Sequence, residues 1–184
     1  MSIKEDICAL FLCCALVFSG CTRFNPETKM SNVKSTALEK IGLEITSHLG
    51  DHQTFLSGDT LSFFINLERE AYLLVIYEDA AGHLTQIIPN AINKNGYSPS
   101  GLFMPLPEEN APYRFKVQAP FGQEKVWVFA ADRAFQKLEG EELANGLFAL
   151  KKDLSVIIKK IRTKKMTAFG EATLTFQTQA KNTI

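Results

Sequence analysis

The amino-acid sequence predicts a mainly β fold: an antiparallel, immunoglobulin-like β-sandwich with one C-terminal amphipathic helix followed by a final strand. Two runs, residues 71–78 and 125–131, are apolar on both alternating faces, which is typical of strands that are covered on both sides. Several shorter runs alternate apolar with polar residues between Gly- and Pro-rich turns, a pattern that favours a sandwich over a parallel sheet. A later segment, from about residue 140 to 162, repeats apolar residues at three- and four-residue steps, as an amphipathic helix does.

The composition is that of one globular domain. The chain has 184 residues, of which 46% are hydrophobic and 22% are charged. Its formal net charge is zero, which argues against nucleic-acid binding because that needs a clearly cationic face. The four cysteines precede the body of the domain, so neither a disulfide framework nor a cysteine-based zinc site can form there; they are Cys8, Cys13, Cys14 and Cys21.

The amino terminus carries a short apolar run at residues 7–18. The run is well short of the about 20 residues that span a bilayer, and it suits the hydrophobic region of a secretory signal. Ser19 and Gly20 then stand directly before Cys21, and this stretch resembles the lipobox of bacterial lipoproteins.

That resemblance implies that residues 1–20 are a signal peptide and that Cys21 becomes the first residue and carries the acyl chains. Thr22 follows the cysteine, instead of the aspartate that favours inner-membrane retention in such proteins. The expected location is therefore the cell envelope, on the periplasmic face of the outer membrane. The alternative is a short apolar tail on a cytosolic protein.

After Cys21, residues up to 40 are polar and show no alternation, so we expect residues 21–40 to be a tether. The β-sandwich domain is expected at residues 41–178, with a tail at 179–184. Its first strand covers about residues 41–46. His48 and His52 flank Asp51, but no third strong ligand is nearby in the sequence, so we expect loop histidines and no metal site.

Turns separate the central strands. Residues 55–59 end in Gly-Asp, which predicts a turn whose aspartate bonds nearby backbone amides, and a half-buried strand follows at 61–67. Residues 79–82 form a second turn, which joins the strand at 71–78 to a hairpin partner at 83–88.

The longest irregular stretch of the body runs from Pro89 to Gly101. Loops of this size in compact domains tend to be functional, and rigid scaffolds carry recognition on them. It offers hydrogen-bonding groups and one aromatic ring, so the candidate binding residues are Asn90, Asn93, Lys94, Asn95, Tyr97 and Ser98. The alternative is a plain connector.

Further strands are expected at residues 102–106, on an edge, at 113–117, and at 166–178 with one face buried. Trp127, the only tryptophan, is expected to fill the core. The helix has acidic residues at its start, while its last turn and the residues beyond are basic, as the helix dipole favours. A basic cluster of this kind can also bind anionic lipid or glycan.

The body resembles a bacterial family catalogued as domain of unknown function 4384. The likeness covers about Phe55 to Asp132 and rests on the order of several short motifs: Gly58-Asp59, Tyr72-Leu73, Gly82, Pro89-Asn90, Pro105 and Pro120-Phe-Gly-Gln-Glu124. It implies a β-sandwich module that is found in lipoproteins and beside kinase-like or protease-like domains. It implies no catalytic residues.

Two function classes follow. The first is a non-catalytic, lipid-anchored envelope module that binds an envelope protein or cell-wall glycan and needs no cofactor; an accessory of a secretion machine is a variant of it. The second is a lipid-anchored hydrolase, which needs a nucleophile, a base and an orienting group within reach. The sequence lacks a Gly-x-Ser-x-Gly elbow, a His-Glu-x-x-His helix and a phosphate-binding glycine loop. Its carboxylate and histidine candidates are Glu78, Asp79, His83, Glu124 and Asp132, and we expect turn and strand-end roles for them and no enzyme activity.

Overall fold

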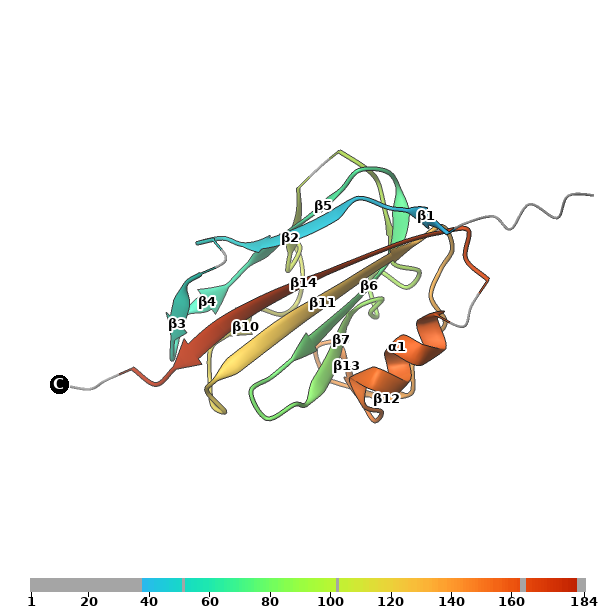
Figure 1. Ribbon diagram of the computed structural model, residues 1–184. Coiled ribbons are helices and arrows are strands. Elements are labelled where there is room, and N and C mark those ends of the chain that lie inside the picture. Colours follow the sequence, from blue (N-terminus) through green and yellow to red (C-terminus); the bar gives the residue numbers. More distant parts are fainter. Residues whose placement is uncertain (1–37, 51, 102, 163–164, 182–184) are drawn as a thin grey trace, which may run out of the picture. The chain divides into compact units, whose positions relative to one another are not determined.

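The computed structural model describes residues 38–50, 52–101, 103–162 and 165–181 (Figure 1). The expected signal peptide, Cys21 and most of the expected tether lie outside these residues, as does Asp51. Within the described ranges, no helix is both long and apolar enough to cross a membrane.

The largest element is a nine-stranded sheet. Two further strands lie off its main path: β3 (Thr54–Leu56) pairs with β14, and β8 (Tyr97–Ser98) pairs with β6. The strands along the main path are, in spatial order, β1 (Glu39–Lys40), β14 (Ala168–Gln179), β11 (Gln123–Ala131), β6 (Ala71–Glu78), β7 (Leu84–Ile88), β13 (Phe148–Leu150) and β12 (Gly140–Glu142).

Two smaller sheets complete the β structure. One has the strand order β2 (Leu43–Ser47), β5 (Phe63–Leu67) and β9 (Met104–Leu106), and the other pairs β4 (Thr60–Leu61) with β10 (Phe115–Lys116). The strand expected at 102–106 is confirmed as the edge strand β9.

The sheets are mixed, which corrects the predicted antiparallel sandwich in part: most neighbouring strands are antiparallel, but β1 and β3 both run parallel to β14. β14 comes near the end of the chain while β1 and β3 come near the start of the domain, so no tight hairpin joins them and forces an antiparallel direction. β1 also lies inside the segment expected to be tether, so the ordered sheet begins at Glu39.

The nine-stranded sheet buries apolar side chains on both faces. β6 contributes Leu73 and Val75 to the cluster that includes residues of the smaller sheets, and Leu74 and Ile76 to the cluster that includes α1 (Leu154–Arg162). All four are fully buried. The prediction that this strand is covered on both sides is therefore confirmed.

The predicted helix at 140–162 is correct only in its second half. α1 begins at Leu154, and the preceding residues form the β12–β13 hairpin. The hairpin turn is Asn145-Gly146, where Gly146 has φ 79° and the Asn145 side chain accepts a hydrogen bond from the Leu147 amide. Because β13 pairs with β7, the open edge of the large sheet supplies the backbone partners that a helix would have supplied internally.

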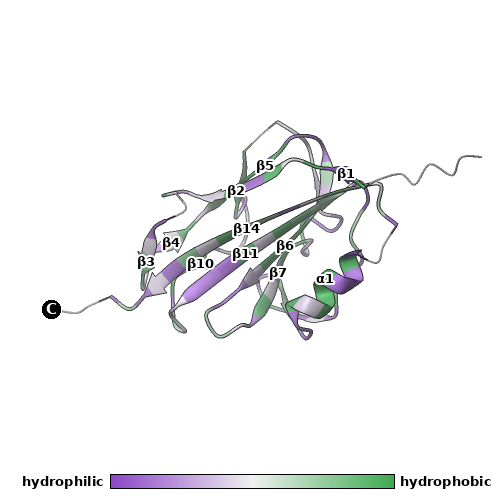
Figure 2. Ribbon diagram, viewed as in Figure 1, coloured by the Kyte–Doolittle hydropathy of each residue, from purple (hydrophilic) through white to green (hydrophobic). Residues whose placement is uncertain are grey.

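α1 itself has the amphipathic character that its spacing predicts. Ile157 and Ile161 are buried against the sheet, while Lys159 and Lys160 are exposed. The ribbon of α1 accordingly carries both apolar and polar segments (Figure 2).

Trp127 lies at the margin of the core and not at its centre, which corrects its predicted role. It is only half-buried, its indole N–H donates to Glu78 at 2.9 Å, and its ring packs against the cluster that includes α1. The Lys125 ammonium lies 5.7 Å from the ring centroid. The indole nitrogen of Trp127 therefore has a hydrogen-bond partner at the margin of the core, as is usual for a partly buried tryptophan.

Candidate functional site

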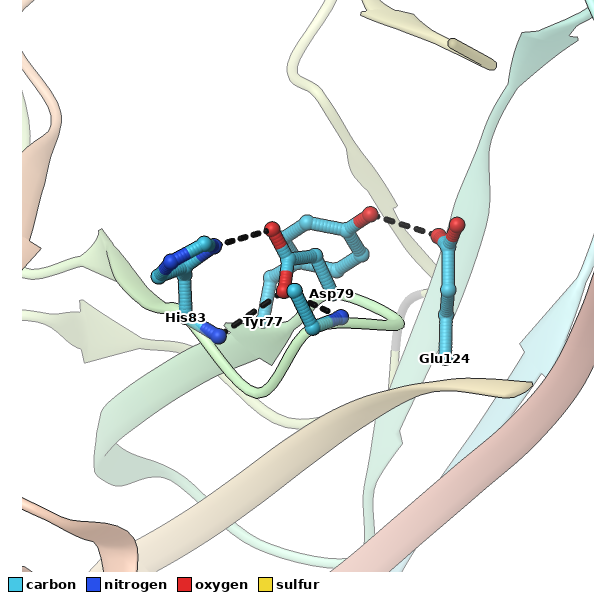
Figure 3. A network of polar contacts seen from close by, with 5 residues as sticks. Tyr77, Asp79, His83 and Glu124 are labelled. Atoms are coloured by element: carbon cyan, nitrogen blue, oxygen red, sulfur yellow. Dashed lines mark hydrogen bonds and ion pairs between the residues drawn. The ribbon is translucent and has the colours of Figure 1, made fainter. Parts of the chain in front are cut away.

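A buried carboxyl group joins the three central strands at one end of the large sheet. Glu124 on β11 is 3% exposed. It accepts a hydrogen bond of 2.5 Å from the Tyr77 hydroxyl on β6 (Figure 3) and one of 2.7 Å from the Thr178 hydroxyl on β14. Val126 is the register partner of Tyr77, and because side chains alternate along a strand, Glu124 shares the face of Tyr77.

This carboxyl has a raised proton affinity. Burial raises the pKa of Glu124, and the nearby charge of Asp79 adds to the effect, while the hydrogen bonds from Tyr77 and Thr178 oppose it. Burial, and then the bond to Glu124, raises the pKa of the Tyr77 phenol. The phenol is therefore a permanent donor at ordinary pH.

The motif residue Gly122 is part of the same junction. Its amide donates to the Thr178 hydroxyl at 3.1 Å, and its carbonyl accepts from the Thr178 amide at 2.8 Å. Its φ of 151° lies in the region that favours glycine, and an added Cβ would come within 3.1 Å of the Ala80 Cβ.

Asp79 and His83 form a second polar group at the neighbouring hairpin turn (Figure 3). One Asp79 oxygen accepts from the amides of Ala81 and His83 at 2.9 and 2.8 Å, and the other lies 2.9 Å from His83 Nδ1. Partial burial alone would raise the pKa of Asp79, but the bonds from His83 and Ala81 outweigh it and hold that pKa below its ordinary value. The aspartate therefore anchors the turn, as its position predicts.

Only Asp79, His83 and Glu124 of the five candidate groups come together. Glu78 accepts the Trp127 indole N–H, and Trp127 packs against the cluster that includes α1. Asp132 follows the other end of β11 and accepts from the hydroxyl of Thr167 at 2.6 Å.

A cavity of about 240 Å³ adjoins Glu124, Tyr77 and Asp79. The Arg114 guanidinium on its wall donates to the backbone carbonyls of Ala111, Tyr113 and Glu109. Both oxygens of Glu124 and both of Asp79 likewise accept hydrogen bonds or an ion pair from the protein itself. These hydrogen bonds stabilise this end of the sheet, and the charged groups of Arg114, Glu124 and Asp79 all bond to other atoms of the domain.

The histidine pair expected to be loop residues takes no part in this cluster. His48 stacks on Phe55 with ring centroids 5.8 Å apart, and its Nδ1 lies 3.3 Å from the Ser62 amide and carbonyl. In the part of the chain that the structure describes, no group of three His, Cys, Asp or Glu side chains is placed to hold a metal ion.

The candidate binding loop is held together by its own asparagines. Asn90 is 8% exposed, and its Oδ1 accepts from the amides of Ile92 and Asn93, both at 2.8 Å. Asn93 and Asn95 each accept from a backbone amide two or three residues later. Such side-chain turns explain asparagine at these positions without a ligand. Ser98 is buried on β8.

Three of the six candidates are exposed: Lys94, Asn95 and Tyr97. The Asn95 side chain accepts from the Tyr97 amide, so Lys94 and Tyr97 offer the better surfaces for a partner. Tyr97 is 43% exposed, donates its hydroxyl to Glu70 at 2.8 Å and packs edge-on against Tyr72. Lys94 instead lines a different surface, a groove of about 440 Å³.

We name this surface the loop–hairpin groove. Its walls come from the loop after β7, the segment before β12, and the β12–β13 hairpin; the lining residues are Gln86, Pro89, Asn90, Ala91, Lys94, Phe135, Lys137, Glu142 and Phe148. The Lys137 ammonium lies 5.3 Å from the Phe148 ring centroid. The Ala91 amide donates to the Gly146 carbonyl at 3.1 Å, which ties the loop to the hairpin. The groove thus combines two ammonium groups with an aromatic face.

Sequence reasoning missed this groove because it assigned the hairpin to a helix. The Asn145-Gly146 pair is the signal that could have found it, since this dipeptide is the strongest short-range hairpin signature. Tyr77 and Thr178 were also missed as partners of Glu124, because strand register decides those contacts.

Residues 54–134 match the model of a protein family, the Domain of unknown function (DUF4384). The resemblance read from the sequence over about residues 55–132 is confirmed. Neither a curated protein nor a solved structure matches the chain. The hairpin, α1 and β14 follow the matched segment, yet β14 pairs with all of β11, from Phe169 to Gln177. The chain therefore carries a DUF4384 domain at residues 54–134, and strands beyond it complete the sheet.

Proposed function

We propose that this protein is a non-catalytic, lipid-anchored module of the bacterial cell envelope that binds an envelope protein or cell-wall glycan through the loop–hairpin groove. The acyl chains on Cys21 hold it to the periplasmic face of the outer membrane, and its fold is an immunoglobulin-like sandwich. Support for the sandwich is the core cluster shared by the large sheet and the smaller sheets. Support for the anchor is the lipobox-like stretch that ends at Cys21.

The observation that carries the binding role is the chemistry of the groove. Phe148 offers an apolar, aromatic wall, and Lys94 and Lys137 offer two ammonium groups around one opening of about 440 Å³. Ligand sites commonly combine an apolar lining with a few convergent polar groups. The asparagines beneath it fix the loop backbone, so a partner would meet a surface whose shape is already formed.

A hydrolase has less support. A nucleophile, a base and an orienting group must be free to act on a substrate. Asp79 instead accepts hydrogen bonds from backbone amides, and Glu124 accepts them from hydroxyl groups of neighbouring strands.

The test is partner capture with two lysines removed. Lys94→Ala together with Lys137→Ala removes both ammonium groups, and Lys116→Ala together with Lys181→Ala is the control because all four lysines are exposed. Tyr97→Ala is a poorer probe, since it also removes the contacts to Tyr72 and Glu70.

Each variant is expressed in the native membrane, crosslinked, and also sedimented with purified cell-wall sacculi. We expect unchanged thermal unfolding in both variants. Crosslinked protein or bound sacculi should fall at least several-fold for the groove variant alone. Equal capture by the groove variant, the control and the wild type would exclude this groove as the binding surface.

A further inference from the structure

The start of the described chain lies on an apolar patch with a cationic border. A hollow of about 420 Å³ is lined by Leu38, Lys40, Arg162, Met166, Phe169, Gly170 and Glu171. Leu38 is 56% exposed, although it is a large aliphatic residue. β1 and the start of β14, which bring these residues together, lie at the same end of the large sheet (Figure 1). We name this surface the tether-side patch.

The charges around the tether-side patch favour an anionic partner. Two carboxylates at this end are paired: Glu39 with Arg69 at 2.9 Å, and Glu171 with Arg162 at 3.0 Å. Glu68, beside Gly42, is exposed and makes no ion pair with a described residue. Asp132 accepts a hydrogen bond from Thr167. By contrast, Lys40, Lys159 and Lys165 make no ion pair with any residue that the structure describes, and all three are exposed.

The tether joins the domain at this patch, so the patch is the part of the described chain nearest to Cys21 along the sequence. Sixteen residues separate Cys21 from Leu38, and even a fully extended chain of that length reaches only about 60 Å. The opposite end of the sheet lies further from the point where the tether joins the domain. β14 pairs with β1 at Ala168 and with β3 at Gln179, a separation of about 35 Å at the ordinary rise along a strand.

We propose that the tether-side patch rests directly on the anionic phospholipid surface of the membrane that holds the acyl anchor. Leu38 and the side chains of Met166 and Phe169 contact the interfacial region, and the lysines around them face the phosphate groups. Attraction between lysines and an anionic membrane extends only about 8 Å at physiological salt. The lysines therefore attract phosphate groups only when the patch lies close to the membrane. This inference depends on the lipid anchor of the proposed function. It adds an orientation: the opposite end of the domain faces the periplasm.

A single fluorescent probe tests the orientation in the lipidated protein. After removal of residues 1–20, Cys21 is the only cysteine in the chain and its thiol is acylated. Leu38→Cys or Leu49→Cys then gives one labelling site each. The two positions are matched in exposure, at 56% and 57%, and Leu49 follows His48, which stacks on Phe55 of β3 at the far end.

The labelled proteins are reconstituted into vesicles of phosphatidylethanolamine and phosphatidylglycerol that contain a spin-labelled lipid. We expect an environment-sensitive probe at position 38 to shift to shorter wavelength and to be quenched several-fold more than the probe at 49. Lys40→Glu with Lys159→Glu should abolish that difference in the same vesicles. Equal emission and quenching at 38 and 49 would overturn the inference, as would quenching at 38 that the charge reversals leave unchanged.

Failure of the anchor itself is read separately. The intact mass of each preparation reports whether Cys21 is acylated, so an unacylated protein refutes the proposed function, while an acylated protein without the positional difference refutes only the orientation. Thermal unfolding of the double-glutamate variant shows whether it is folded. Should it unfold, charge is reversed instead at Lys165 alone, which lies outside every helix and strand.

Discussion

Removing the Glu124 carboxyl should destabilise the domain, because two hydroxyl groups on neighbouring strands bond to it. Glu124→Ala leaves the Tyr77 hydroxyl and the Thr178 hydroxyl without the partner that they bond at 2.5 and 2.7 Å. A buried polar group that loses its partner costs about 1–3 kcal/mol. The Thr178 hydroxyl can still donate to the Gly122 carbonyl at 3.3 Å, so the Tyr77 hydroxyl dominates and the predicted loss is about 1–3 kcal/mol. That is a measurable part of the roughly 5–15 kcal/mol stability of a typical domain.

Glu124→Gln separates the hydrogen bonds from the charge. Its amide can accept from Tyr77 and donate to Thr178, so the variant should keep most of the stability at acidic pH. Because burial raises the pKa of Glu124 in the folded protein, the folded state favours the protonated carboxyl. The stability from that proton is fully present below the unfolded value of 4.5 and is lost as the pH rises through the folded value.

Glu124→Gln should therefore gain stability relative to the wild type as the pH rises above 4.5 and through the folded value of Glu124. Asp79 does not disturb this comparison. Its lowered pKa makes a contribution that is present above its unfolded value of 3.8 and is lost only as the pH falls through the folded value. The measurement is urea unfolding at each pH, with slope and midpoint fitted separately.

A double-mutant cycle with Tyr77→Phe isolates the bond between the two side chains. We expect a coupling of about 1–3 kcal/mol, the range for a hydrogen bond to a charged or buried group. Unchanged midpoints for Glu124→Ala, or a coupling near zero, would refute the assignment of Glu124 as the junction of the three strands.

Two further stability predictions follow from the corrected elements. Trp127→Ala should cost about 2–3 kcal/mol, below the 3–5 kcal/mol of a fully buried tryptophan, because the ring is only half-buried; a loss of more than about 4 kcal/mol by urea unfolding would return it to the core. Gly146→Ala should lower the free energy of unfolding by about 1 kcal/mol or more, because Gly146 has φ 79° and an added Cβ would lie 3.0 Å from the Ala91 Cβ. Gly50→Ala is its control, since Gly50 has φ 92° and no atom lies within 4 Å of an added Cβ. Equal losses of unfolding free energy in both variants would mean that the close contact between hairpin and loop adds no cost.

The strands with a strong local pattern could be predicted from sequence. The run at 71–78 has apolar side chains at successive positions, so only a place between two layers could bury them, and β6 occupies that place. The turn aspartates were also predictable, because a short carboxylate in a glycine-containing turn commonly accepts from nearby backbone amides. Asp59 accepts the Leu56 amide, and Asp79 accepts two amides of its own turn.

Contacts that depend on distant partners could not be predicted. The leucines of residues 143–150 fit helical spacing, and only the open edge of β7 decides that they form a hairpin. The polar character of Asn90 suggested recognition, but in the structure its side chain faces the loop backbone. Glu124 gave no local sign of burial, since register alone places Tyr77 and Thr178 beside it.

The lipid anchor can be tested most directly by the intact mass of the mature protein. The wild type and Cys21→Ser are expressed with the full chain in a Gram-negative host, and membrane and soluble fractions are measured by mass spectrometry. Our account predicts that the wild type is recovered from membranes, begins at Cys21 and carries the mass of its acyl chains. Cys21→Ser should lack that mass and should retain residues 1–20. Recovery of the wild type from the cytosol with Met1 intact would contradict the account.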